Sequence, residues 1–156
     1  MKFNLEKDIV FFDVESTGLN ILRDRIIQIG LIKHFADSSE PVELELLINP
    51  GGVLISEDAF KVHGISSEDV AKKPTFKQVA QQIFDFIGDA DLSGYNAIRF
   101  DIPMLMEEFY RAGFDFNIDD RRLIDVQRLF YKMEPRTLSA ASVSYTHLTL
   151  PTICSV

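Results

Sequence analysis

The sequence predicts a single α/β domain. The first observation is the unbroken apolar run Ile9–Phe12, which is typical of a strand covered on both faces. The second is a pair of β-branched or alternating segments, residues 25–33 and 42–48, which indicate further strands. The third is the recurrence of apolar residues at three- and four-residue spacing in residues 74–88 and 101–113, which indicates amphipathic helices.

The three N-terminal strands are expected to form an antiparallel meander. The first strand ends in two carboxylates and a Thr-Gly turn, within the segment DIVFFDVESTGL. The next two strands are separated by the polar stretch Ala36–Pro41, which favours a reversal of the chain. Residues 50–52 (Pro-Gly-Gly) then break the strand pattern, and residues 56–58 (Ser-Glu-Asp) open a short helical stretch toward Gly64.

Two longer helices are expected in the second half. The first has Pro74 at its start and Gly88 just past its end, and the second begins at Asp101 and is stopped by Gly113. Their apolar faces carry Phe76, Val79, Ala80, Ile83, Phe84 and Ile87 in the first helix, and Ile102, Leu105, Phe109 and Ala112 in the second. Residues 91–96 look like the end of another buried strand, and residues 123–126 like one more strand that runs into a short helix.

Composition limits the classes of protein that the chain can belong to. A length of 156 residues with 46% hydrophobic residues fits one globular domain with a real core. No apolar run approaches the roughly 18 residues that span a bilayer, so we expect a soluble, cytoplasmic protein without a membrane segment. The single cysteine, Cys154, excludes an intramolecular disulfide and a multi-cysteine metal site. A bound metal must therefore have oxygen or histidine ligands.

The chain is acidic, with a formal net charge of -8. This charge argues against a protein that coats duplex backbone, because such binding depends on many lysine and arginine contacts. It does not exclude an enzyme that grips a few nucleotides through metal ions, since the metals supply the positive charge facing the phosphate.

The C-terminal segment differs from the rest. After Arg136 the chain contains no Asp, Glu, Lys or Arg, and the tail SVSYTHLTLPTICSV is rich in serine and threonine. We interpret residues 1–141 as the domain and residues 142–156 as a non-native tail, the scar of a frameshift, an assembly error or cloning, which replaces the natural C-terminus.

Two carboxylates close the first strand. Asp13 and Glu15 leave the same face of the strand, because side chains alternate along it, and they can converge on one site. Hard divalent cations prefer such oxygen ligands. Glu43 and Glu45 have the same spacing but alternate with apolar residues, which is the pattern of a solvated strand face. Only the first pair ends a doubly buried strand, where α/β sheets place their sites.

Three other residues have both a functional and a structural interpretation. Asp101 precedes a helix with an early proline and could be its N-cap. His63, followed by glycine, could be the last residue of a helix, and Asn96 could be a turn former at a strand end. Each residue is ambiguous when it is taken separately.

Three segments taken together resemble the DEDD exonuclease superfamily in order and approximate spacing. They are FFDVESTGL near the start, VHGIS after the third strand, and GYNAIRFDIPMLMEEF. The resemblance covers about residues 8–140 and is to the DnaQ-like branch (DEDDh type), which includes the proofreading subunit of bacterial DNA polymerase III and relatives that trim RNA. It implies a ribonuclease H-like fold, a mixed central sheet flanked by helices.

The same resemblance implies the site and the chemistry. Asp13, Glu15 and Asp101 match the acids that hold two metal ions, Mg²⁺ or Mn²⁺, and Asp13 matches the bridging ligand. The implied reaction is in-line attack by a metal-activated water on the terminal phosphodiester, which releases nucleoside 5′-monophosphates from a single-stranded 3′ end. The positions that match substrate contacts are Thr17, Gly18, Leu19, His63, Asn96 and Phe100.

The third motif of the family is missing. PRTLSAA, which ends at Ala141, resembles the segment that leads into it, but no acidic residue follows. We do not assign the general-base role to His147, and we interpret Asp125 as structural. Loss of a general base costs about 10² to 10⁴ in rate, so we expect the chain as printed to be weak or inactive and its intact parent to be an active exonuclease.

Two other classes of function are open. One is a catalytically inactive module of the same fold that binds nucleic-acid ends or a DNA polymerase, and the other is an unrelated acidic α/β domain that binds metal without hydrolysis. The retained acids Asp13 and Glu15 favour the exonuclease, because their mutual repulsion serves no purpose in a module without catalysis. The sequence leaves open the choice of DNA or RNA, the proofreading, repair or trimming role, the polymerase partner and the oligomeric state.

Overall fold

The computed structural model describes residues 6–126. Its strands are β1 (Ile9–Ser16), β2 (Ile26–His34), β3 (Val42–Leu47), β4 (Asp91–Gly94) and β5 (Leu123–Asp125). Its helices are α1 (Glu57–His63), α2 (Ser67–Val70), α3 (Phe76–Ile87) and α4 (Ile102–Arg111), with a π-helical turn, η1 (Ala97–Asp101), directly before α4. Helix α2, which the sequence interpretation missed, begins with a capping box between Ser66 and Asp69.

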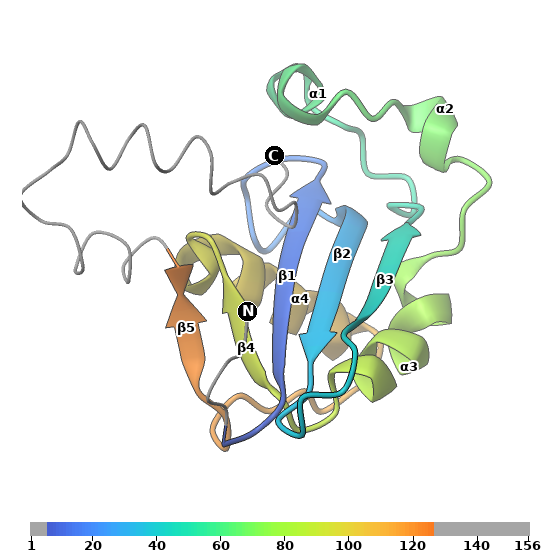
Figure 1. Cartoon of the computed structure of the whole chain (residues 1–156). Helices are drawn as coiled ribbons and strands as arrows, with labels where there is room; N and C mark the ends of the chain where they lie inside the picture. The colour runs from blue at the N-terminus through green and yellow to red at the C-terminus, as the bar shows by residue number, and fades with distance from the viewer. Residues whose placement is uncertain (1–5, 127–156) are drawn as a thin grey trace, which may run out of the picture.

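The five strands form one mixed sheet in the order β3-β2-β1-β4-β5 (Figure 1). Strands β1, β2 and β3 are antiparallel neighbours, which confirms the predicted meander. Strand β4 lies parallel to β1 and β5 lies parallel to β4. The carboxyl ends of the parallel strands β1 and β4 therefore lie at the same end of the sheet, where α1 also lies.

Helices α3 and α4 pack on one face of the sheet and enclose the core. The predicted apolar face of α3 is buried except for Phe84, which is partly buried against the same cluster. From β1 the residues Val10, Phe12 and Val14 point into this core. Phe109 of α4 stacks on Phe116, with ring centroids 4.7 Å apart. Burial of this apolar surface fixes both helices against the sheet.

The other side chains of β1 leave the opposite face. Phe11, Asp13 and Glu15 are partly buried and alternate with the core residues. Asp13 is paired with Gly30 of β2, and a Cβ atom at Gly30 would meet no heavy atom within 4 Å. The neighbour of Asp13 thus leaves open space beside the carboxylate.

One structural interpretation was wrong. Asp101 has helical backbone angles, φ -65° and ψ -44°, and its side chain makes no cap hydrogen bond, so it is not an N-cap. The physical reason is η1, because the chain is already helical before α4 begins. The interpretation of His63 as the last residue of a helix is confirmed, and Gly64 follows with the left-handed φ of 69°.

Several predictions lie outside the described residues. They concern the domain end at residue 141, the tail, the segment PRTLSAA and His147. Within residues 6–126, no helix is both long and apolar enough to cross a membrane.

Candidate active site

Asp101 meets the acids of β1 at the edge of the sheet. It ends η1, which follows β4, and is only 6% exposed. Burial raises the pKa of its carboxyl group to about 8, with further contributions from the nearby carboxylates of Asp13 and Glu15. A backbone N–H of Val14 opposes the rise. Asp101 therefore lies close enough to the two acids of β1 to be repelled by their charge, and Asp125 of β5 adds a smaller contribution.

Glu15 also resists ionisation. Burial raises the pKa of its carboxyl group above the ordinary value. Without a cation, charge on Asp101 or Glu15 is unfavourable, so these two acids have the character of an anionic site that a positive ligand would stabilise.

The donor set fits a divalent cation chemically. Mg²⁺ and Mn²⁺ take carboxylate oxygens, and the carboxylates of Asp13, Glu15 and Asp125 all raise the pKa of Asp101, so four carboxylates share one electrostatic neighbourhood. In the part of the chain that the structure describes, however, no three His, Cys, Asp or Glu side chains are already placed to hold a metal ion.

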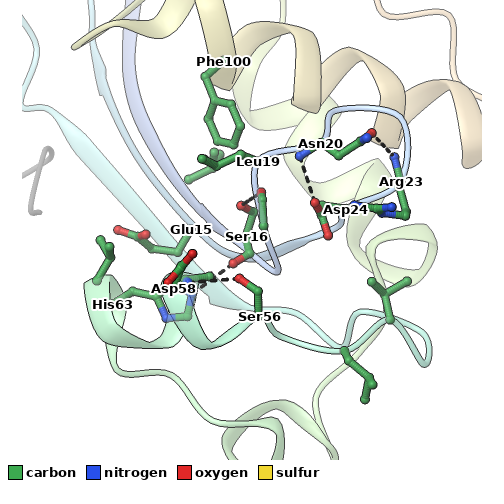
Figure 2. A pocket seen from close by; sticks show the side chains of 16 residues that line it. Glu15, Ser16, Leu19, Asn20, Arg23, Asp24, Ser56, Asp58, His63 and Phe100 are labelled. Atoms are coloured by element: carbon green, nitrogen blue, oxygen red, sulfur yellow. Dashed lines mark hydrogen bonds between the residues drawn. The ribbon is translucent and has the colours of Figure 1, made fainter.

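An open cleft of about 980 Å³ adjoins these acids (Figure 2). This volume is in the range of pockets that bind small ligands. Of the predicted site residues, the lining includes Glu15, Gly18, Leu19, His63 and Phe100. Asp13, Thr17, Asn96 and Asp101 do not line the cleft.

Leu19 and Phe100 lie near each other on one side of the cleft, and Glu15 and the α1 residue His63 lie on another side (Figure 2). Leu19 is 84% exposed, although it is a large apolar residue. An exposed apolar side chain at the mouth of a cleft favours contact with a ligand that has flat apolar faces.

The loop between β1 and β2 is held by its own polar groups. The Thr17 hydroxyl donates to Asp24 Oδ1 at 2.8 Å and accepts from the Arg25 N–H at 3.0 Å. The second oxygen of Asp24 accepts from the Asn20 N–H at 2.8 Å. Thr17 is fully buried, so its hydroxyl positions the loop and is not open to the cleft.

Gly18 leaves room for Asp24. A Cβ atom at Gly18 would lie 2.6 Å from Asp24 Oδ2, well inside van der Waals contact. We expect Gly18→Ala to displace the Asp24 carboxylate, to break its bonds to Thr17 and Asn20, and to destabilise the fold by about 1–3 kcal/mol. Urea denaturation measures the loss.

The matched control for this prediction is Gly30→Ala. A Cβ atom at Gly30 meets nothing within 4 Å, so this variant should be as stable as the wild type or slightly more stable. Equal stability of the two variants would contradict the packing argument.

His63 ties α1 to the end of β1. Its Nδ1 accepts from the Ile65 N–H at 3.0 Å, so the ring proton is on Nε2, which donates to the Ser16 carbonyl oxygen at 3.0 Å. Both ring nitrogens are thereby occupied. His63 lines the cleft and supports its wall.

A hydrogen bond joins Asn96, which precedes η1, to Asp125 at the end of β5. Asn96 has a left-handed backbone, φ 55°, and its N–H donates to Asp125 Oδ1 at 3.0 Å. This bond supports the interpretation of Asp125 as structural. The Asn96 side chain is exposed, and its turn role agrees with the structural interpretation.

The sequence interpretation missed several residues of the cleft. Asp24 and Ser56 line it, together with the exposed apolar residues Leu54 and Val62. Two signals were present: Ser56 is the N-cap of α1, and Leu54 is an apolar residue in a loop. Asp24, in the loop between β1 and β2, has no comparable sequence signal, because its hydrogen-bond partners come together only in the folded turn.

Comparison with known proteins decides the family. The model of the exonuclease family RNase_T matches residues 10–149, nine tenths of the chain. The chain belongs to the exonuclease family. The DnaQ-like resemblance is thereby confirmed. The match passes residue 141, the expected end of the domain, but the described residues stop at 126, so that boundary stays a prediction.

Curated relatives agree with this assignment. The chain is 34% identical over 111 residues to the DNA polymerase III subunit epsilon of Buchnera aphidicola, covering 68% of this chain and 47% of the relative. It is 33% identical over 132 residues to the subunit of the same name from Haemophilus influenzae, covering 81% and 51%. The chain thus spans about half the length of the curated relatives it matches.

Solved structures share the fold. Exonuclease I from Methylocaldum szegediense has a TM-score of 0.72 at 22% identity, over 85% of this chain and 31% of that one. The zinc-ion-bound form of an Escherichia coli exonuclease I complex with single-stranded DNA has a TM-score of 0.70 at 23% identity, over 85% and 31%. The fold is the ribonuclease H-like exonuclease fold, as the sequence resemblance implied.

Proposed function

We propose that the domain is a 3′-5′ exonuclease that hydrolyses terminal phosphodiester bonds of single-stranded DNA or RNA and releases nucleoside 5′-monophosphates. One observation carries the proposal: three carboxylates from β1 and η1 gather at the edge of an open cleft, where burial and repulsion raise the pKa of Asp101 to about 8. Strongly perturbed acids beside a cleft are typical of catalytic sites.

Asp13, Glu15 and Asp101 would hold two divalent cations, Mg²⁺ or Mn²⁺. The chemistry supplied by such cations when bound is charge stabilisation at the terminal phosphate and a lower pKa of the attacking water. Asp101 must lose its proton to become a ligand, so binding should release protons and strengthen as the pH rises.

The remaining residues would hold the terminal nucleotide. Leu19 and Phe100 offer apolar contacts to the base and sugar from one side of the cleft. His63 fixes α1 through the Ser16 carbonyl and lines the cleft on the other side. Thr17 and Gly18 act through the loop, whose shape they fix, and Asn96 turns the chain toward η1.

Activity of the chain as printed is proposed to be weak. After residue 141 the sequence contains no acidic residue, and we do not assign the general-base role of the family pattern to His147. Residues 142–156 are proposed to be foreign to the domain. Because the curated relatives are polymerase III epsilon subunits, association with a DNA polymerase is proposed as the cellular setting.

The experiment uses single strands labelled at either end, with Mn²⁺ and with the natural C-terminus restored. A 3′-5′ exonuclease frees a 3′ label as a mononucleotide in the first turnover, whereas a 5′ label stays on a strand that shortens stepwise. A strand that is bound but never shortened would instead support the inactive binding module. Early loss of the 5′ label would contradict the proposed polarity.

A further inference from the structure

A buried carboxylate of α4 lies outside the acidic site and outside the cleft lining. Glu108 is 1% exposed and accepts three hydrogen bonds. Its donors are Arg25 Nε at 2.8 Å, the Ile26 N–H at 2.9 Å and Arg111 Nη1 at 3.3 Å. Burial of a carboxylate is costly, and here three donors offset that cost. The arrangement is therefore specific, and what it holds in place indicates its role.

Arg111 extends the contact to the middle of the β1–β2 loop. Its Nη2 donates to the Leu22 carbonyl oxygen at 2.7 Å. Residues 17–25, here called the pocket loop, are therefore attached to α4 at two points, at Leu22 and where the loop enters β2 at Ile26. The attachment joins residues more than 80 positions apart in the sequence.

The pocket loop forms one wall of the cleft. Gly18, Leu19, Asn20, Arg23 and Asp24 all line the cavity. Helix α4 begins directly after Asp101 and carries Glu108 and Arg111 in its last two turns. The continuous helical segment of η1 and α4 thus carries both an acid of the candidate metal site and the two residues that hold the wall that would face the nucleotide.

We propose that Glu108 and Arg111 are positioning residues, a clamp that sets the pocket loop at the distance from Asp101 that nucleotide binding requires. The inference rests on the proposed function, because the clamp is proposed to support the binding of a nucleic-acid end. Neither side chain lines the cleft, so the clamp acts only through the loop.

Arg111→Met is the informative variant. The Arg111 side chain is 25% exposed, and without it Glu108 keeps Arg25 and the Ile26 N–H, so the variant should fold. Hydrogen exchange of the bonded loop amides of Asn20, Leu22, Arg23 and Asp24 should become about tenfold faster, while exchange in α3 stays unchanged.

Binding is measured with fluorescent oligothymidylate and oligouridylate in Mn²⁺. The affinity of Arg111→Met should fall about tenfold, while its Mn²⁺ affinity in calorimetry stays at the wild-type value. The strand affinity of Arg111→Lys should lie between that of the wild type and that of Arg111→Met. One ammonium group can reach Leu22 or Glu108, but it lacks the guanidinium fork that reaches both. Glu107→Gln is the control. The Glu107 side chain is 32% exposed and its carboxylate lies 4.0 Å from Arg111, so this ion pair is long and weak.

The outcomes separate the two proposals. Faster loop exchange with weaker strand binding supports the clamp. Unchanged loop exchange overturns it, and so does faster exchange with unchanged strand affinity. A wild-type chain that binds Mn²⁺ but neither strand overturns the proposed function, and the exchange data then decide only whether Arg111 holds the loop.

Discussion

At pH 8 without divalent cations, the Asp101→Asn variant should unfold at a higher temperature than the wild type. The folded state holds the pKa of Asp101 at about 8, against an ordinary value of 3.8. Between these values the folded chain keeps a proton that the unfolded chain has released. The stability that this group contributes is complete below pH 4 and falls by about 1.4 kcal/mol per pH unit as the pH rises toward 8.

Asparagine removes that penalty, so the difference in free energy of unfolding between variant and wild type should grow from pH 4 to pH 8. Mn²⁺ should reverse the order, because it stabilises the ionised wild type and finds an incomplete site in the variant. Glu43→Gln, an exposed acid of β3, is the control and should follow the wild type. A difference that does not change with pH would show that Asp101 is ionised normally.

The second large effect is expected for Glu108→Ala. Removal of this carboxylate leaves Arg25, Arg111 and the Ile26 N–H without their shared acceptor inside the fold. Breaking a buried ion pair from one side costs about 3–5 kcal/mol. Urea denaturation should therefore show a midpoint far below that of the wild type, with the slope of the transition unchanged.

Glu107→Ala provides the comparison on the same helix. Its carboxylate is 4.0 Å from Arg111 and partly exposed, so its loss should cost about 0–1 kcal/mol. Similar midpoints for the two variants would mean that Glu108 is not the structural centre of the clamp.

Local patterns predicted the elements well. The doubly buried strand with Asp13 and Glu15, the meander, and the apolar face of α3 all follow from the spacing of residues along the chain. These features depend on neighbours in sequence, which is the information that periodicity contains. The distinction between Asp13 and Glu43 also held, since the strand of Glu43 is largely exposed at the sheet edge.

Long-range partners could not be predicted in the same way. Glu108 lies on the apolar face of α4 between Leu105 and Phe109, which was a signal of a paired buried acid, but its partner Arg25 is 83 residues away. The role of Thr17 depends on Asp24 in a folded turn. Asp101 was interpreted as a possible N-cap because no sequence pattern indicates the π-helical turn that precedes α4.

Exonuclease activity is tested directly by the release of 5′-mononucleotides from a 3′-labelled single strand with Mg²⁺ or Mn²⁺. It compares four forms: the chain as printed, the form with its C-terminus restored, and that restored form with Asp13→Ala or with Glu43→Ala. We expect weak release by the printed chain, strong release by the restored form and its Glu43→Ala variant, and a loss of at least about a thousandfold for Asp13→Ala. Equal release by the Asp13→Ala and Glu43→Ala forms, or no release by any form, would contradict it.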